Sequence, residues 1–403
     1  MTFSRTLKPV FYPDAVNHMK LNGRAKSDIL TDRTGSYNSG FDKFDLFDLN
    51  PQNLTSFDTS GNTTTHILIQ IDLGTSAPDV DYVALLNHNL VSAEGTIRVA
   101  HSASTMSTAG AGTTIVSGTA TLNGSWVPDS GETINEAVDN SETDIDVSDG
   151  TKFTVGEIIR VSGGSGNENM LIGSIVSNTL TVTRAQQGSS ATTFEVGDNI
   201  FRYNCVTPAA DGDTLIDFTA SSDRYWALEI IPSDGVFSAT DLTIGAMMIG
   251  EQHTLSLSPD INVGHSFEMN GVNISTGISG KRHSSPNWIK ASNTTWTTGN
   301  YIPFRLDVGT SQIPGREVYS FSYSFIDDTG FFPSDLGSPS GDNFIFDVMS
   351  RTAWQAVPLI MSVDSTSTTQ GDYIFCRFRA DSFNLTQVAS SVYSTSFSVD
   401  QEF

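Results

Sequence analysis

The seven histidines are the first residues that could do chemistry, because imidazole serves as a general base and as a metal ligand. They are spread along the chain, at His18, His66, His88, His101, His253, His265 and His283. There is no His-Glu-x-x-His motif, no His-x-His pair and no cysteine beside a histidine. This spacing does not favour metal catalysis. We predict instead that His88, in Asn87-His-Asn-Leu90, caps the end of a strand.

Nucleophile and phosphate motifs are also missing from the sequence. No Gly-x-Ser-x-Gly elbow occurs, so the usual setting of a hydrolase serine is absent. Gly163-Gly-Ser-Gly166 has the composition of a phosphate loop, but it has no lysine and no helical pattern after it. We predict a hairpin turn at this position.

Carboxylates and exposed aromatics are the remaining candidates. Five acidic residues lie close together, at Asp139, Glu142, Asp144, Asp146 and Asp149. They lack the spacing, the glycine and the final glutamate of an EF-hand, so we predict a solvated strand edge, with calcium binding as the alternative. A carboxylate pair for glycoside hydrolysis needs only proximity in space, and nothing in the sequence marks one out.

Trp126, Trp288 and Trp296 lie in polar, loop-like contexts. Contact surfaces between proteins favour tryptophan, and sugars stack on such rings. These three residues are the candidate subunit-interface or glycan contacts, with packing under a loop as the ordinary alternative. The sequence predicts no catalytic residue, no metal site and no cofactor.

Charge and composition limit the partners. The net charge is −24 and only 16% of the residues are charged, so the surface repels phosphate backbones and anionic membranes. No apolar run approaches the length of a membrane span, and the N-terminus has no apolar signal region. We expect synthesis in a cytosol. Cys205 and Cys376 match no disulfide framework or metal spacing, and we expect two buried thiols, with a single long-range disulfide as the alternative.

The elements that must position these residues are strands. Thr65–Leu73 and Glu317–Phe325 alternate apolar and polar residues, which is typical of half-buried strands. In the second segment, Tyr319 and every second residue after it point to one face of the strand. Ser320, Ser322 and Ser324 point to the other face. Turn residues interrupt such runs at short intervals. The predicted class is all-β, built of sandwiches or barrels.

The order of the strands predicts three domains. Residues 132–203 form a self-contained series of short strands between two blocks of similar character, so we predict a small β-barrel inserted into a jelly-roll-like β domain of residues 1–131 and 204–255. Residues 256–403 are predicted to form a C-terminal β-sandwich or barrel domain, with a crossover at 258–300. Residues 1–64 are predicted to be long loops packed on a sheet or, alternatively, an arm on a neighbouring subunit.

The inserted segment carries a specific pattern. Its elements are Gly156-Glu157-Ile158, Glu168-Asn-Met170, Leu180-Thr-Val-Thr-Arg184, Gly188-Ser-Ser-Ala191 and Gly197-Asp198. This pattern resembles a β-barrel module of bacteriophage tail proteins. It departs from that family at Ala185, where the family favours glycine, and at Phe194, where the family often has histidine. The resemblance implies a structural barrel with no known chemistry.

The flanking blocks carry looser patterns. Tyr82–Leu90, Arg98, Arg224-Tyr-Trp226, Ile244-Gly245 and Ile249-Gly250 resemble galactose-binding-like jelly rolls of phage tail proteins. Pro358–Asp364, Phe375–Phe378 and Tyr393–Glu402 resemble the end of tail-tip proteins of the distal-tail type.

These resemblances imply a virion structural protein of a phage tail tip or baseplate, not an enzyme, made in the host bacterial cytoplasm and located in the virion tail. The expected partners are further copies of the chain in a symmetric ring, a hexamer or else a trimer, and tail-tube, hub or fibre proteins. A host-surface glycan is a further expected partner; nucleic acid and membrane insertion are not expected. The alternatives are a glycan-binding receptor adhesin, a depolymerase and a head decoration protein.

Overall fold

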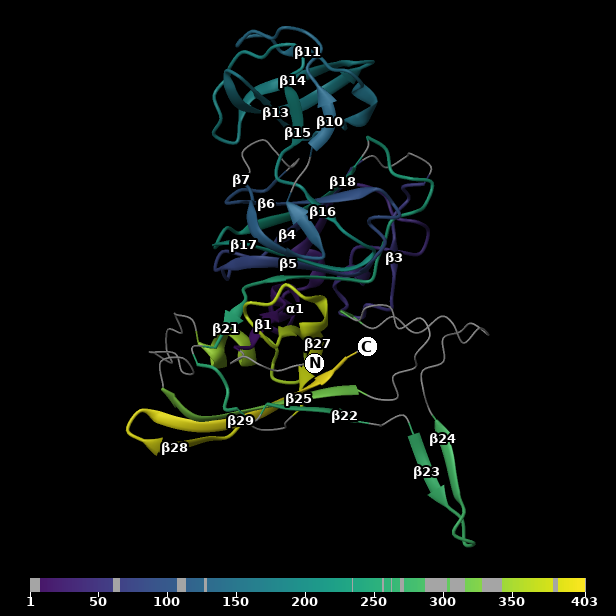
Figure 1. Ribbon diagram of the computed structural model, residues 1–403, viewed down its shortest axis with the longest axis vertical. Helices are drawn as coiled ribbons and strands as arrows, with labels where there is room; N and C mark the ends of the chain where they lie inside the picture. The colour runs from purple at the N-terminus through teal and green to yellow at the C-terminus, as the bar shows by residue number, and fades with distance from the viewer. Residues whose placement is uncertain are drawn as a thin grey trace. The chain divides into compact units, whose positions relative to one another are not determined.

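The computed structural model describes residues 8–60, 66–106, 114–126, 129–233, 235–255, 257–261, 263–268, 272–286, 303–304, 316–327, 343–379 and 383–402. The fold is all-β, as predicted, with 50% of residues in strands and 8% in helices. No helix of these residues is long and apolar enough to cross a membrane. The chain divides into two compact units: the first unit contains residues 1–18 and 251–403, and the second contains residues 19–250 (Figure 1).

Two antiparallel sheets build the body of the second unit. The larger has the order β2 (Leu30–Thr34), β4 (Ile67–Asp72), β18 (Tyr225–Pro232), β6 (Gly95–Ser102), β16 (Val206–Pro208) and β9 (Gly124–Trp126), with β7 (Thr114–Ile115) also paired to β6. The smaller has the order β20 (Ala246–Gly250), β5 (Val80–His88), β17 (Gly212–Ser221) and β8 (Gly118–Leu122). A two-stranded ladder joins β3 (Thr55–Ser56) to β19 (Thr243–Ile244). These sheets form the host sandwich of the second unit.

A separate six-stranded sheet forms the barrel of the second unit. Its order is β10 (Asp129–Thr133), β15 (Asn199–Arg202), β12 (Ile158–Gly163), β13 (Gly166–Val176), β14 (Thr179–Gln186) and β11 (Asp144–Asp146). A bridge between Ile134 and Val147 joins the two end strands, so the sheet closes on itself. Closure removes the unpaired edges that an open sheet would expose. The predicted turn is present, since Gly163 pairs with Gly166 between β12 and β13.

The barrel lies between two neighbouring strands of the host sandwich. β9 precedes it and β16 follows it, and these two strands pair with Val206 opposite Trp126. The ends of the inserted segment are therefore held close together by the host sheet itself. A short distance between the two ends is the condition under which a host loop tolerates an insertion.

An eight-stranded sheet forms the first unit. Its order is β21 (His253–Thr254), β1 (Val10–Pro13), β26 (Leu359–Ser362), β27 (Tyr373–Phe378), β29 (Val392–Gln401), β25 (Arg316–Asp327) and β22 (Gly264–Glu268), and β28 (Leu385–Ala389) also pairs with β29. The alternation predicted for β25 is confirmed: Tyr319, Phe321 and Tyr323 are buried in the core, whereas Ser320 and Ser322 are partly exposed and Ser324 is exposed.

The N-terminal region differs from its prediction. β1 pairs with β26 and β21, so residues 8–18 belong to the first unit rather than to the jelly-roll-like domain predicted for residues 1–131. Two short helices follow, α1 (Ala15–Leu21) and α2 (Lys26–Ile29). The described residues of this region pair within their own chain, for example β1 with β26 and β2 with β4. Residues 1–7 and 61–65 lie outside the described residues.

Two other expectations have clear outcomes. The predicted crossover at 258–300 is wrong for its described part, which contains β22 and a hairpin of β23 (Val272–Thr276) and β24 (Arg282–Pro286). The prediction of two buried thiols is confirmed, because Cys205 and Cys376 are both free and fully buried.

Candidate functional site

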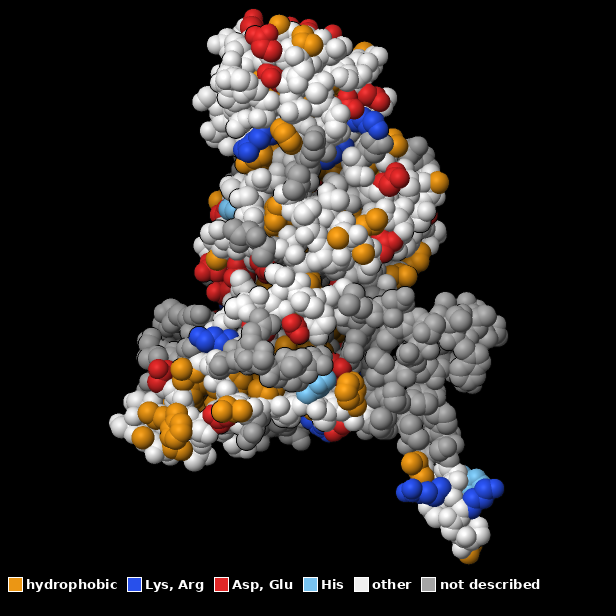
Figure 2. Space-filling view, in the orientation of Figure 1, with side chains coloured by type: hydrophobic (Ala, Val, Ile, Leu, Met, Phe, Trp, Pro, Cys, Tyr) orange, Lys and Arg blue, Asp and Glu red, His pale blue; other side chains and the backbone are white. Residues whose placement is uncertain are grey.

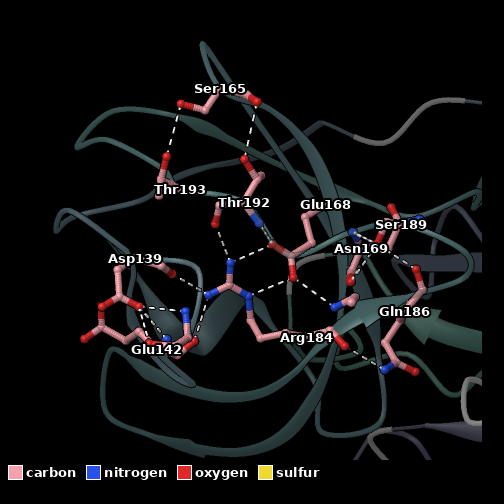
Figure 3. A network of polar contacts seen from close by, with 12 residues as sticks. Asp139, Glu142, Ser165, Glu168, Asn169, Arg184, Gln186, Ser189, Thr192 and Thr193 are labelled. Carbon is pink, nitrogen blue, oxygen red and sulfur yellow. Dashed lines mark hydrogen bonds and ion pairs between the residues drawn. The ribbon is translucent and has the colours of Figure 1, made fainter.

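A buried ion pair joins two residues of the pattern carried by the inserted segment (Figure 3). Arg184 on β14 donates Nε–H to Oε1 of Glu168 at 2.8 Å and Nη2–H to Oε2 at 2.6 Å. Glu168 on β13 has no exposed surface. Such a two-pronged contact is the geometry in which a guanidinium binds a carboxylate most strongly. Both residues belong to the sequence pattern of the inserted segment.

The remaining donors of Arg184 fix the loops around the pair. Nη1 donates to the carbonyl oxygens of Asp139 and Glu142, both at 2.8 Å, and Nη2 also donates to the carbonyl oxygen of Thr192 at 2.7 Å. With the two bonds to Glu168, all five guanidinium N–H groups are used. The arginine therefore has no hydrogen-bonding capacity left for a ligand.

Glu168 is held as a carboxylate by the same network. It accepts from the backbone N–H groups of Ala185 and Thr192, both at 2.9 Å. Burial alone would raise its pKa, but the hydrogen bonds from Arg184, Thr192 and Ala185 outweigh burial and lower the pKa. The arrangement binds two loops to the barrel wall. It is a structural lock rather than an acid or a base.

A second buried network joins the barrel to the host sandwich. In the barrel, Arg202 on β15 donates to Oε1 of Glu157 at 2.5 Å. Its other nitrogen, Nη2, donates to the carbonyl oxygen of Ser233 in the host at 3.0 Å. In the host, Arg98 on β6 donates from Nη1 to the carbonyl oxygen of Ile158 in the barrel at 3.3 Å. Each arginine thus reaches across the junction to a backbone carbonyl.

The charge of Arg98 is balanced by Glu229, which lies directly opposite it on β18. Nε of Arg98 is 2.5 Å from Oε2 of Glu229, and Nε2 of His66 is 2.5 Å from Oε1. Burial alone would raise the pKa of Glu229, but the charge of Arg98 and the contacts with His66 and Arg98 lower it. Burial raises the pKa of the neighbouring Cys205 thiol to about 11, against the opposing charge of Arg98. The cysteine is therefore not an activated nucleophile.

A His–Asp–Ser group lies at the edge of the host sandwich. Nδ1 of His101 is 2.5 Å from Oδ2 of Asp223, and the same nitrogen is 3.3 Å from Oγ of Ser221. In a catalytic triad the carboxylate and the nucleophile contact opposite ring nitrogens. Here both contact Nδ1, and the ring packs against Trp226 at 4.9 Å. The geometry orients the histidine but does not activate the serine.

The acidic residues 139–149 mainly cap turns. Asp139 accepts from the backbone N–H groups of Ser141 and Glu142, and Asp149 accepts from that of Thr151. Asp146 accepts from the hydroxyl of Thr179. Within the residues that the structure describes, no group of three or more possible metal ligands is present.

His88 is the last residue of β5. It is buried, its Nε2 lies 2.8 Å from Oγ1 of Thr214, and its Nδ1 accepts from the N–H of Leu90 at 3.3 Å. The predicted capping of a strand end is therefore present. Burial lowers the pKa of His88 to about 4, so the ring is neutral near pH 7.

Of the three predicted tryptophans, the structure describes only Trp126. Its indole lies directly beneath Gly118 of β8, where an added Cβ would overlap the ring. The side chain is partly exposed. Trp288 and Trp296 lie outside the described residues, so the structure does not bring the three side chains together.

The two ion-pair networks were not foreseen as networks. The sequence pattern contains Glu168 and Arg184 but does not predict that they pair. Arg98 and Glu229 each interrupt a run of apolar residues, Thr96-Ile-Arg-Val-Ala100 and Ala227-Leu-Glu-Ile-Ile231. A charged residue inside such a run is the signal that would have predicted a buried pair, because isolated charges are rarely buried.

Comparisons with known proteins give little more. No family model matches the chain, and no curated protein matches its sequence. Among solved structures, the chain is similar to chitosan-binding module 1 of the chitosanase/glucanase from Paenibacillus sp. IK-5. The identity is 12%, the match covers 55% of this chain and 93% of the module, and the TM-score is 0.20. A likeness at that level carries no argument for ligand or function.

Proposed function

We propose that the chain is a structural protein of a bacteriophage virion, located at the tail tip or baseplate, where copies assemble into a closed ring. It acts as a scaffold: the first unit takes part in the ring, and the barrel of the second unit offers a site for fibres or host contacts. The observation that carries the proposal is the phage-module pattern in the barrel segment.

The structural roles of the pattern residues support this reading. Glu168 and Arg184 lock two loops, as described above, and Glu157 binds Arg202 at the base of the barrel. Met170, Leu180 and Val182 lie in the barrel core. Gly156, Gly188 and Gly197 have positive φ angles of 91°, 72° and 97°, a region that glycine enters at no steric cost. These pattern residues thus serve the shape of the module.

The attachment of the barrel also suits a scaffold. Buried arginines reach across the junction between barrel and host in both directions, so the barrel does not hang on a free linker. A fixed module can present a surface at a set position relative to the host sandwich. The net charge of −24 would keep such an assembly from trapping DNA, whose backbone is also negative.

The experiment is to purify the full chain, measure its mass in solution by native mass spectrometry and image it by negative-stain electron microscopy. We expect closed rings of six or three copies. The same preparation is tested for binding to envelope polysaccharide. A chain that stays monomeric and binds polysaccharide would contradict the scaffold and favour the adhesin.

A further inference from the structure

The hairpin of β23 and β24 forms a small sheet of its own in the first unit. Val272 pairs with Pro286 and Thr276 pairs with Arg282, and in the described part of the chain no third strand joins either edge. Residues 274–283, which include the turn, are exposed, so neither face of this part packs against the fold. A two-stranded hairpin without such packing is at best marginally stable in water. A partner that covers the hairpin would therefore stabilise it.

The hairpin is basic, although the chain is strongly acidic. The segment 269–306, which contains the hairpin, has four of the 21 lysines and arginines of the chain and none of its 45 acidic residues. Lys281, Arg282 and His283 are consecutive and exposed, and Figure 2 shows basic side chains gathered on the hairpin. In the described part of the chain, neither Lys281 nor Arg282 has an ion-pair partner. Both positive charges are therefore available to an acidic partner.

Exposed apolar side chains accompany these charges. Ile278 in the turn is fully exposed, and Ile274 on β23 is 57% exposed. A salt bridge at a protein surface contributes little by itself, whereas burying an isoleucine removes apolar surface from water and favours association. The combination suits a contact with another protein, in which the charges select the partner and the apolar side chains supply part of the affinity.

The acidic counterpart lies on the barrel of the same chain. Residues 132–151 contain seven carboxylates and no lysine or arginine, which is the highest density of acidic residues in the sequence. Asp139 and Asp144 are exposed, and Glu142 and Asp146 are partly exposed. Figure 2 shows acidic side chains gathered over the end of the barrel at β11. This run is therefore the part of the chain that is most complementary in charge to the hairpin.

Charge complementarity favours a second copy of the chain as the partner. Each copy carries both surfaces, so every hairpin finds a matching barrel when copies assemble. Two chains with a net charge of −24 each repel one another, and cations placed against the densest run of carboxylates reduce that repulsion where the copies touch. A nucleic acid or an anionic membrane offers no cations in return, so the acidic remainder of the chain would face an unbroken negative surface.

We propose that the β23–β24 hairpin of one copy docks on the acidic run 132–151 of the barrel of the next copy. Lys281 and Arg282 would lie against the exposed carboxylates, and Ile278 would be buried in the contact. The two surfaces differ, so the contact is heterologous, and a heterologous contact that closes on itself generates a ring. The rest of the barrel surface stays available to fibres or host contacts. This inference rests on the proposed function and names the surfaces that close the ring.

The test reverses the charge of each surface in the full chain. The hairpin variant carries Lys281→Glu and Arg282→Glu. The barrel variant carries Glu142→Lys and Asp144→Lys, since these two carboxylates accept no hydrogen bond in the described structure. Native mass spectrometry gives the copy number, and circular dichroism checks that each variant is folded. We expect rings for the wild-type chain and monomers for both variants.

A matched pair of single substitutions controls for added negative charge. Lys20 is exposed on α1, so Lys20→Glu changes the net charge as much as Lys281→Glu does, at a place away from the hairpin. On dilution, the Lys281→Glu ring should dissociate at a higher protein concentration than the wild-type ring, and the Lys20→Glu ring should match the wild type. Equal weakening by the two substitutions would overturn the specific contact.

Restoring the complementarity gives the decisive result. A chain with all four charge reversals has the wild-type net charge and should form the wild-type ring. An equimolar mixture of the hairpin variant and the barrel variant should assemble with equal numbers of each, because the hairpin of each variant matches the barrel of the other. Assembly of the four-substitution chain without assembly of the mixture would place the hairpin on its own barrel and overturn the contact between copies.

The remaining outcomes separate this contact from the proposed function. Rings that persist in both variants overturn this pair of surfaces and leave ring assembly intact. If, in addition, wild-type protein binds phosphatidylglycerol vesicles and the hairpin variant does not, the hairpin serves a membrane surface instead. A monomeric wild-type chain overturns the ring itself, and this contact with it.

Discussion

The lock between Glu168 and Arg184 predicts a large and local loss of stability in Arg184→Met. The substitution keeps most of the side-chain volume but removes all five donors, leaving Glu168 charged and fully buried. Removing one partner of a buried ion pair costs about 3–5 kcal/mol. We take the lower value, about 3 kcal/mol, because two backbone N–H groups still donate to the carboxylate.

Hydrogen exchange followed by mass spectrometry is the assay, because the barrel contains no tryptophan. A loss of about 3 kcal/mol corresponds to about 10²-fold faster exchange in peptides that contain Ala185 and Thr192. Arg160→Met is the matched control: Arg160 is a partly buried barrel arginine that donates to Asn169 without binding a carboxylate. Equal effects of the two substitutions would refute the lock.

The same pair predicts a pH dependence. The pKa of Glu168 is lowered in the folded chain, so its stabilising contribution is present above the unfolded value of 4.5 and is lost as the pH falls through the lower, folded value. In wild-type protein, the protection of amides near Ala185, relative to their intrinsic exchange rates at the same pH, should therefore fall below about pH 4. In Arg184→Met the buried carboxylate has lost its main partner and its pKa rises, so the loss of protection relative to wild type should shrink as the pH falls and the carboxyl is protonated.

Two further substitutions test the host sandwich. Gly118→Ala places a methyl group against the ring of Trp126 and the carbonyl oxygen of Asp217, so we expect a loss of about 1–3 kcal/mol in urea unfolding followed by tryptophan fluorescence; an unchanged midpoint would contradict this packing. Burial and the charge of Asp81 raise the pKa of Asp217 to about 7. The free energy of unfolding should therefore fall by up to about 4 kcal/mol as the pH rises from about 4 to about 7. Asp217→Asn should therefore be more stable than wild type at pH 8 and equal to it at pH 4, and a gain of the same size at both values would rule out this cause.

The all-β fold could be predicted because alternation is a local property. In β25 every second residue from Tyr319 to Tyr323 enters the core, and the intervening serines face outward, as the sequence indicates without any knowledge of partners. The barrel could be predicted for a similar reason, since its strands follow one another with short turns between them.

The pairing of distant segments could not be predicted in the same way. β1 is only four residues long and is buried throughout, so it shows no alternation, and its partner β26 lies near the other end of the chain. The pair of Arg98 and Glu229 depends on the register of β6 against β18. Alternation predicts which residues share a face of one strand, but it does not predict which residue of another strand lies opposite.

The insertion point has an evolutionary implication. β9 and β16 flank the barrel in the sequence and are hydrogen-bonded to each other. Recombination can therefore add or remove the barrel segment without breaking a strand pairing of the host sheet. The constraint lies elsewhere, in Arg98, which donates to the carbonyl oxygen of Ile158 in the barrel. In a related protein without the barrel, the Arg98 side chain would lose this acceptor and would be exposed to solvent. We expect such a protein to have a smaller or uncharged residue in place of Arg98, together with a matching change at Glu229.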